Sequence, residues 1–153
     1  MQIQRLYISS GHNYFGHHGQ KPGEHPMFER DEIECVAGRG IAGDRFFEFK
    51  PDYSGQITFF AEEVYDALCR EFALSDKDAS GFRRNVITRG ADLNSLIGRE
   101  FEIENVRFRG EKACDPCHWM DYAFAPGAEA FLKGQGGLRA SILSSGKLHR
   151  QRV

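Results

Sequence analysis

Turn-forming residues recur along the chain about every eight to twelve positions, a spacing that leaves room only for short apolar segments between them. The sequence contains 17 glycines and 5 prolines, and both residue types favour turns over long helices. Apolar runs predict strands in five segments, at residues 3–8, 33–37, 56–60, 85–88 and 138–143.

A further pair of strands is predicted between residues 101 and 109. Apolar side chains there fall on odd positions up to Ile103 and on even positions from Val106. Because neighbouring strand residues point to opposite faces, this switch predicts a tight hairpin or a bulge at Glu104 and Asn105.

Helical periodicity is weaker. Apolar residues three and four positions apart predict an amphipathic helix of about three turns, carried by Ala61, Val64, Tyr65, Leu68 and Phe72. Residues 126–133 predict a second short helix, and residues 89–98 predict a turn with one helical turn. The regular strand–helix alternation of a parallel sheet is missing. We therefore predict one mostly β domain over residues 1–153, a mostly antiparallel barrel or curled sheet with peripheral helices.

Composition excludes several partners. The net charge of −2 gives no general attraction to nucleic acid or to an anionic membrane, so any bound anion needs a local arginine group. No apolar run approaches the roughly 20 residues that cross a bilayer. Four cysteines without an export signal predict free thiols in a reducing compartment, so we expect a cytoplasmic protein.

The segment Cys114-Asp115-Pro116-Cys117 is the strongest candidate for chemistry. A cysteine thiolate is both a nucleophile and a soft metal ligand, and nearby positive charge favours it by lowering the thiol pKa. Three alternatives remain open: a structural zinc site, for which the pair supplies only two of four ligands; a thioredoxin-like redox pair; and plain core cysteines. The last alternative suits Cys35 and Cys69 better.

Arginine-containing segments suggest an anion site. Arg83 and Arg84 precede a predicted strand, where guanidinium groups suit a phosphate and Asn85 suits the edge of a heterocycle. The alternative for the two arginines is a solvated charge pair.

Two glycine-rich segments also carry arginines. Residues 38–45 contain Gly43, Asp44 and Arg45, and residues 134–139 end at Arg139. Glycine backbones can approach an anion closely, although Asp44 and Arg45 could equally form a local ion pair, and Arg139 could sit exposed on a hairpin. Residues 11–30 predict an irregular surface loop, histidine-rich between residues 12 and 25, either a lid or a plain polar loop.

Between residues 33 and 148 the chain contains five characteristic segments, in the order GRGIAGDR, QITFF, FRRNVITRGADLNSLIG, FRGEKACDPCHWM and GQGGLRASIL. Together these segments resemble the MOSC family. MOSC names the C-terminal domain of molybdenum cofactor sulfurases, and the small stand-alone bacterial members are most similar in length. The resemblance implies a barrel-like β fold and binding of the molybdenum cofactor, a pterin dithiolene with a terminal phosphate.

The resemblance also implies roles for residues. Cys117 would supply the thiolate to molybdenum. The pterin and its phosphate would be held by Arg83, Arg84, Asn85, Arg45, Asp44, Gly43 and Arg139. Cys114 departs from the family pattern and gives a second thiol near Cys117, which allows a persulfide or disulfide relay between the two. Some small members act on N-hydroxylated bases, so we expect an oxidoreductase that reduces such a small molecule with electrons from a partner protein. The alternative is a non-catalytic sulfur carrier or cofactor-insertion module using a Cys117 persulfide. Since no pyridoxal phosphate domain accompanies this chain, a cysteine desulfurase would be a separate partner.

Overall fold

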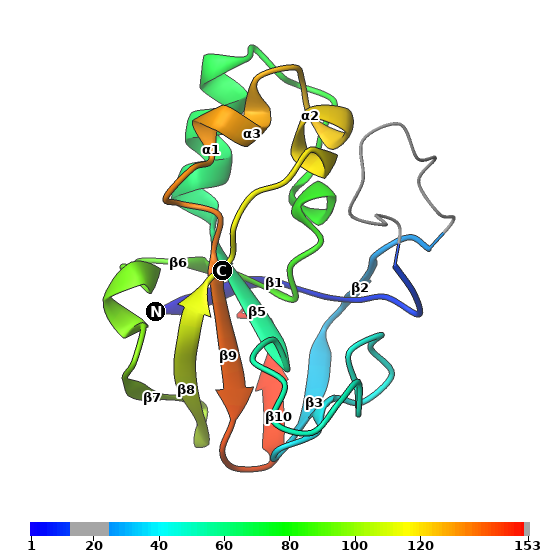
Figure 1. Ribbon diagram of the computed structural model, residues 1–153, viewed down its shortest axis with the longest axis vertical. Helices are drawn as coiled ribbons and strands as arrows, with labels where there is room; N and C mark the ends of the chain where they lie inside the picture. Colours follow the sequence, from blue (N-terminus) through cyan, green and yellow to red (C-terminus); the bar gives the residue numbers. More distant parts are fainter. Residues whose placement is uncertain (13–24, 152–153) are drawn as a thin grey trace.

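The computed structural model describes residues 1–12 and 25–151, and in this part the chain forms two sheets with helices gathered at one end (Figure 1). The strands are β1 (Gln2–Ile8), β2 (Phe28–Arg30), β3 (Glu32–Val36), β4 (Gly40–Ile41), β5 (Ile57–Ala61), β6 (Val86–Arg89), β7 (Glu100–Ile103), β8 (Val106–Ala113), β9 (Leu138–Ile142) and β10 (Gly146–His149). The helices are α1 (Glu62–Glu71), α2 (Trp119–Ala123) and α3 (Ala128–Phe131), with the 3₁₀ turns η1 (Ala79–Phe82) and η2 (Leu93–Leu96). No helix in the described ranges is long and apolar enough to cross a membrane.

The larger sheet has the strand order β2-β1-β6-β5-β9-β8-β7, and the smaller one has the order β10-β3-β4. All described strand pairs are antiparallel except β5 with β6, which run parallel because α1 connects them. The predicted fold class, mostly β with peripheral helices, is confirmed.

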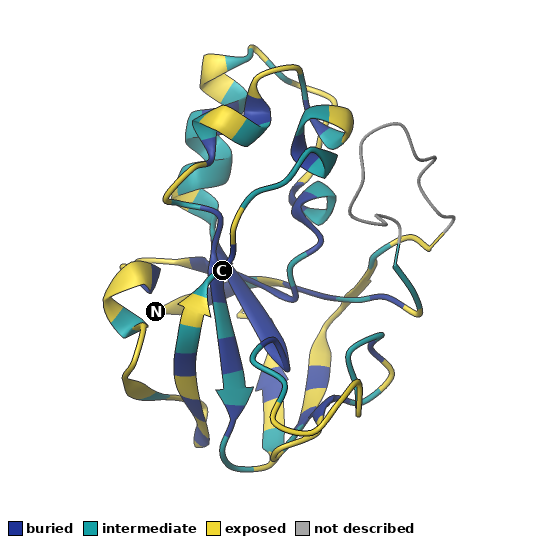
Figure 2. Ribbon diagram, viewed as in Figure 1, coloured by how far each residue is buried: buried dark blue, intermediate teal, exposed yellow. Residues whose placement is uncertain are grey.

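Strand β5 lies at the centre of the larger sheet and separates two apolar cores (Figure 2). Consecutive strand residues point to opposite faces, so Phe59 packs into the core between the strands while Phe60 packs into the core under the helices. The Phe60 ring stacks on Phe82 with centroids 3.8 Å apart, and Phe124 packs against Phe82 at 4.4 Å. This second core fixes η1 and α2, the two elements that flank the cysteine segment.

The predicted hairpin is confirmed in detail. Ile103 pairs with Val106 across a two-residue turn, and both turn residues adopt positive φ, 50° for Glu104 and 68° for Asn105. Two positive φ values are the signature of the tight hairpin turn whose twist matches the strands it joins. The local pattern alone was therefore enough to locate this element.

Strands β2, β4 and β10 were not predicted. Residues 28–30 form the edge strand β2, so the prediction of an irregular loop over residues 11–30 is wrong at its end; residues 13–24 lie outside the described residues. The only buried residue of β10 is Leu148, and β4 is two residues long. Such strands form because a neighbouring strand offers hydrogen-bonding partners. The sequence of a short or polar segment does not indicate that such a neighbour exists.

Candidate functional site

A cavity of about 320 Å³ brings together segments that are far apart in the sequence. Its walls come from β5, β9 and α2, and from the loops that follow β4, precede β6 and follow β8. The lining residues are His12, Arg45, Phe46, Tyr53, Thr58, Phe82, Arg83, Arg84, Cys114, Asp115, Cys117, Trp119, Met120 and Arg139. Both cysteines of the Cys-Asp-Pro-Cys segment and four predicted arginines thus share one hollow.

The two cysteines differ in exposure. Cys114 follows β8 and is 4% exposed, whereas Cys117 precedes α2 and is half-buried; both are free thiols. Burial raises the pKa of the Cys117 thiol, and this effect outweighs the backbone N–H of Trp119 and the charge of Arg84, which both lower it. The raised pKa means that Cys117 keeps its proton at neutral pH. A metal that binds this sulfur has to displace that proton.

The geometry gives little support to the two other roles considered for the cysteine pair, a zinc site and a redox pair. Within the described ranges no group of three or more His, Cys, Asp or Glu side chains could hold a metal ion, so a zinc bound by Cys114 and Cys117 lacks further ligands there. Residues 114–117 form no hydrogen-bonded turn, and Cys114 stands at the end of a strand. A redox pair at the start of a helix has a different arrangement.

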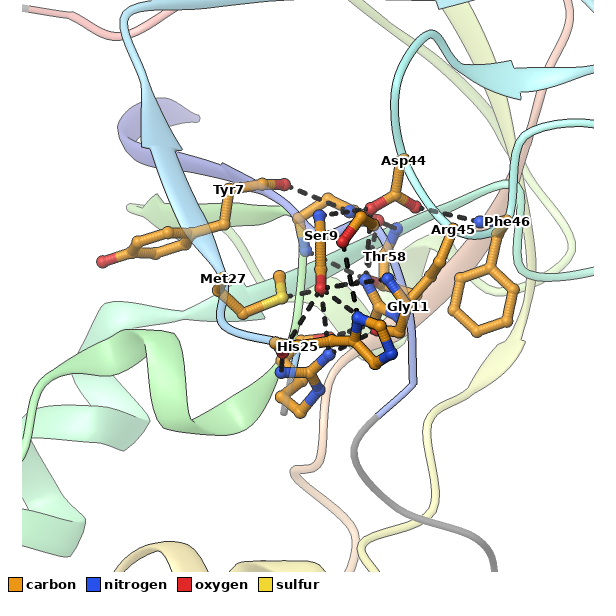
Figure 3. A network of polar contacts seen from close by, with 12 residues as sticks. Tyr7, Ser9, Gly11, His25, Met27, Asp44, Arg45, Phe46 and Thr58 are labelled. Carbon is orange, nitrogen blue, oxygen red and sulfur yellow. Dashed lines mark hydrogen bonds and ion pairs between the residues drawn. The ribbon is translucent and has the colours of Figure 1, made fainter. Parts of the chain in front are cut away.

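Asp44 and Arg45 form a buried ion pair, with 3.1 Å between Arg45 Nη1 and Asp44 Oδ1. The same carboxylate accepts hydrogen bonds from the backbone N–H groups of Ser9 at 3.0 Å and Phe46 at 3.3 Å (Figure 3). Burial lowers the pKa of Arg45, and Asp44 opposes that shift. Asp44 and the preceding Gly43, at φ 84°, do not line the cavity; they shape the turn that presents Arg45.

The Arg83 guanidinium is surrounded by oxygen acceptors. It donates to the carbonyl of His25 at 2.7 Å, to the carbonyl of Gly11 at 2.8 Å and to Ser9 Oγ at 3.2 Å. In return its own carbonyl accepts from Arg45 Nη2 at 2.9 Å. Burial lowers the pKa of Arg83 to about 10, so the group stays charged at neutral pH. Arg83 therefore joins the chain at Gly11 to the chain at His25 and adds positive charge to the cavity wall.

Asn85 is 1% exposed, and its side chain serves the sheet. Its Oδ1 accepts from the backbone N–H of Thr58 and from Thr58 Oγ1, both at 3.0 Å, and its Nδ2 donates to the Tyr7 carbonyl at 3.2 Å. Asn85 thus bridges the chain at β1 and β5 beneath the cavity and is not among the lining residues.

The side chains of Arg84 and Arg139 make fewer hydrogen bonds than that of Arg83. Arg84 donates from Nε to the Gly136 carbonyl at 3.2 Å and from Nη1 to the Phe82 carbonyl at 2.9 Å. The side chain of the half-buried Arg139 makes no hydrogen bond or ion pair with any residue in the described part of the chain. Its guanidinium therefore keeps its full donor capacity toward the cavity.

The second glycine-rich segment is needed for close packing. A Cβ on Gly136 would lie 2.3 Å from the Cys114 carbonyl oxygen and 3.2 Å from Pro116 Cδ. The backbone N–H of Cys114 also donates to the Gly137 carbonyl at 2.8 Å. Glycine at position 136 thus permits the contact that holds the cysteine segment beside β9.

The aromatic part of the cavity wall was not predicted from the sequence. The His12 ring packs against Phe46 with centroids 4.8 Å apart, and Tyr53 packs on Phe46 at 5.2 Å. Trp119 donates from Nε1 to the Gly81 carbonyl at 2.8 Å. Its ring centroid lies 5.9 Å from the guanidinium carbon of Arg83. The only signal was local: Trp119 is the single tryptophan and lies two residues after Cys117.

The fold and the site define a class of protein. It is a small β-rich domain in which thiol and guanidinium groups line one cavity. A family model of the MOSC domain matches residues 17–148, and the chain belongs to the MOSC domain family. No curated protein sequence matches the chain.

Solved structures with low sequence identity share the fold. The YuaD protein from Bacillus subtilis is 18% identical with a TM-score of 0.73, over 97% of this chain and 90% of that one. YiiM from Geobacillus stearothermophilus is 11% identical with a TM-score of 0.69, over 97% of this chain and 70% of that one. YiiM from Escherichia coli is 17% identical with a TM-score of 0.62, over 100% of this chain and 71% of that one.

Proposed function

We propose that this chain binds the molybdenum cofactor in the cavity and reduces an N-hydroxylated small molecule, with Cys117 as the protein ligand of molybdenum. The observation that carries the proposal is the convergence of the Cys117 thiol and four arginines on one cavity. MOSC domains are associated with this cofactor, and the chain belongs to that family.

The residues present fit such a group. A soft thiolate suits a soft metal centre, and guanidinium groups suit a terminal phosphate through paired hydrogen bonds. The volume of about 320 Å³ lies within the range of about 300–1,000 Å³ that is usual for ligand cavities. When bound, the cofactor would supply electrons, taken from a partner protein, to the N–O bond of the substrate.

The chain's own residues would prepare the site. Cys117 would hold the metal through its deprotonated sulfur, and the charge of Arg84, which lowers the thiol pKa, would ease the loss of that proton. The rings of Phe46, Tyr53 and Trp119 give the cavity an apolar part of its lining. The pKa of His12 is lowered by burial and by Arg45 and Arg83, so its ring stays neutral at pH 7 and one ring nitrogen can accept a hydrogen bond from a ligand.

The test is to purify the protein from a host that makes the cofactor and to measure bound molybdenum and pterin. We expect stoichiometric molybdenum in the native chain and its loss in Cys117→Ser. Cys69→Ser is the matched control, because Cys69 is also a half-buried free thiol but lies on α1, away from the cavity. Molybdenum near zero in the native chain, or unchanged in Cys117→Ser, would count against the proposal.

A second candidate function is a sulfur carrier or cofactor-insertion module, in which Cys117 holds a persulfide received from a separate cysteine desulfurase. The observation that favours it is the second free thiol, Cys114, in the same cavity. Intact-mass spectrometry separates the candidates, because the carrier gains the mass of one sulfur atom on Cys117, labile to reductant, and turns over no substrate. Both candidates belong in the cytoplasm, whose reducing conditions keep such thiols free.

A further inference from the structure

A second cavity, of about 480 Å³, shares no lining residue with the first. Its walls come from the end of β5, the first turn of α1, the loop after β6, the turn η2 and the glycine turn before β9. The lining residues are Ala61, Glu63, Val64, Ala91, Asp92, Leu93, Asn94, Gly134, Gln135 and Gly137. The second cavity therefore lies at the carboxyl ends of β5 and β6, the parallel pair of the described strands, and parallel strands commonly bind ligands at that edge.

One part of the second cavity is apolar. The side chains of Ala61, Val64 and Ala91 are partly buried there, and Leu93 is 6% exposed and packs into the core between the strands. A hydrocarbon group that covers such a surface removes apolar area from water, which favours binding. The ligand of this cavity is therefore expected to carry an apolar part.

The amide side chains of the second cavity offer acceptors. Asn94 donates from Nδ2 to the Gly134 carbonyl at 2.9 Å, and Gln135 donates from Nε2 to the Phe131 carbonyl at 2.9 Å. Their oxygens, Asn94 Oδ1 and Gln135 Oε1, accept no hydrogen bond from a residue in the described part of the chain. Each amide is thus fixed through its nitrogen and keeps its oxygen for a ligand.

Two carboxylates add negative charge to these acceptors. Glu63 accepts from the backbone N–H of Gly90 at 2.7 Å through Oε1, which leaves Oε2 for a ligand. The Asp92 carboxylate makes no hydrogen bond or ion pair with a described residue and does not cap η2. Among the described residues that line this cavity, none is basic.

Positive groups near the second cavity do not cancel its charge. Arg89 is bonded to Glu62 at 2.9 Å and to Asp66 at 3.0 Å, so two other carboxylates already balance it. Lys133 is exposed and is not among the lining residues. The positive end of the α1 dipole is offset by Glu62 and Glu63 in the first turn of that helix.

We propose that the second cavity binds a small primary alkylammonium ligand, with its charged nitrogen at Asp92 and Glu63 and its hydrocarbon chain on Val64 and Leu93. An ammonium group has only N–H donors and no acceptor, so it matches a set of carboxylate and amide oxygens. A carboxylate ligand would be repelled there, and a neutral alcohol would gain no charge-assisted hydrogen bond. The inference goes beyond the proposed function and uses none of the residues assigned to it.

The experiment is an NMR titration of the isotope-labelled, full-length chain with n-butylammonium chloride at constant ionic strength. We expect saturable shifts of the backbone N–H signals of Gly90, Asn94 and Gln135. The uncharged probe n-butanol should bind about fivefold more weakly or less, because it lacks the charge. An absence of saturable shifts, or equal affinities for the two probes, would overturn the proposal.

Two carboxylate variants locate the charged end of the ligand. Asp92→Asn should weaken n-butylammonium binding about fivefold, and the double variant Asp92→Asn, Glu63→Gln about tenfold or more, as for charges that are partly screened by water. Asp76→Asn is the matched control, since Asp76 is also exposed but lines neither cavity, and it should change the affinity by no more than about 1.5-fold. An equal loss in Asp76→Asn would mean general charge attraction and not a site.

Two further measurements separate a ligand site from a role in folding and from the proposed function. Because the Asp92 side chain makes no bond within the described chain, Asp92→Asn should keep the native melting temperature. A large fall would assign Asp92 to the scaffold and refute its role in binding. Cys117→Ser should bind n-butylammonium with native affinity, whether or not Cys117 binds molybdenum, and weaker binding would place the probe in the first cavity.

Discussion

Replacing Asn85 by aspartate tests whether this residue belongs to the scaffold or to a ligand. The substitution keeps the oxygen that accepts from Thr58 but turns the Nδ2 donor to the Tyr7 carbonyl, 3.2 Å away, into a second oxygen. One buried hydrogen bond is lost, worth about 1 kcal/mol, and an unpaired carboxylate then faces a carbonyl in a site 1% exposed. Uncompensated buried charge typically costs about 3–5 kcal/mol, so we expect a loss of this size in the free energy of unfolding at pH 7.

The pH dependence of that loss has a predictable sign. Burial raises the folded-state pKa of the new carboxyl above its unfolded value of about 3.9, so the protonated form is favoured in the folded chain. The stability deficit of Asn85→Asp should therefore shrink as the pH falls, because a protonated carboxyl can donate to the Tyr7 carbonyl, and it should grow as the pH rises.

Urea unfolding at pH 7 and pH 5 measures both effects, and a deficit of this size corresponds to a melting temperature lower by about 10 °C. The matched control is Asn94→Asp, because Asn94 also donates to a carbonyl, that of Gly134 at 2.9 Å, but is exposed. The control should change stability by no more than about 0.5 kcal/mol. If Asn85→Asp unfolds like the native chain and only ligand binding suffers, the structural role assigned to Asn85 is refuted.

Two further predictions concern the cysteine segment. Gly136→Ala places a methyl group 2.3 Å from the Cys114 carbonyl oxygen, so we expect a loss of about 1–3 kcal/mol in calorimetric unfolding; an unchanged melting temperature would mean that residues 114–116 yield freely. Alkylation of Cys117, followed by mass spectrometry across a pH series, should reach its midpoint above that of a free cysteine, because burial raises the pKa of this thiol. Arg84→Gln should move that midpoint higher still, since the Arg84 charge lowers the pKa, and a downward shift would contradict the electrostatic account.

Local signals in the sequence predicted the parts of the fold that depend on nearby residues. The β7–β8 hairpin follows from the parity switch at Glu104 and Asn105, and α1 follows from apolar residues three and four apart. Strand β10 depends instead on Leu148 pairing with Ile33, a contact between residues that are far apart in the sequence. A four-residue segment with one buried side chain carries no sign of such a distant partner.

The same distinction applies to the site. Residue chemistry alone suggested that a thiol and several arginines would meet, and they line one cavity. It could not reveal that Arg83 is bonded to the carbonyls of Gly11 and His25, which lie 72 and 58 positions away. It also could not distinguish the inward Asp44–Arg45 pair from an exposed one, because the distinction depends on burial that only the assembled fold creates.

The charge balance of the cavity connects the Cys117 thiol with the arginines that line the same walls. Four guanidinium groups and the carboxylate of Asp115 line the walls, and one of the four, Arg45, is already paired with Asp44, so the lining carries net positive charge. A phosphomonoester, with about −1.5 to −2 charges at neutral pH, would offset much of that charge. Because burial holds Cys117 in its protonated form, the thiol does not compete for the same positive charge before a ligand arrives. The arginines would therefore be free to bind the anionic end of the ligand first, and the sulfur would lose its proton only when a metal binds to it.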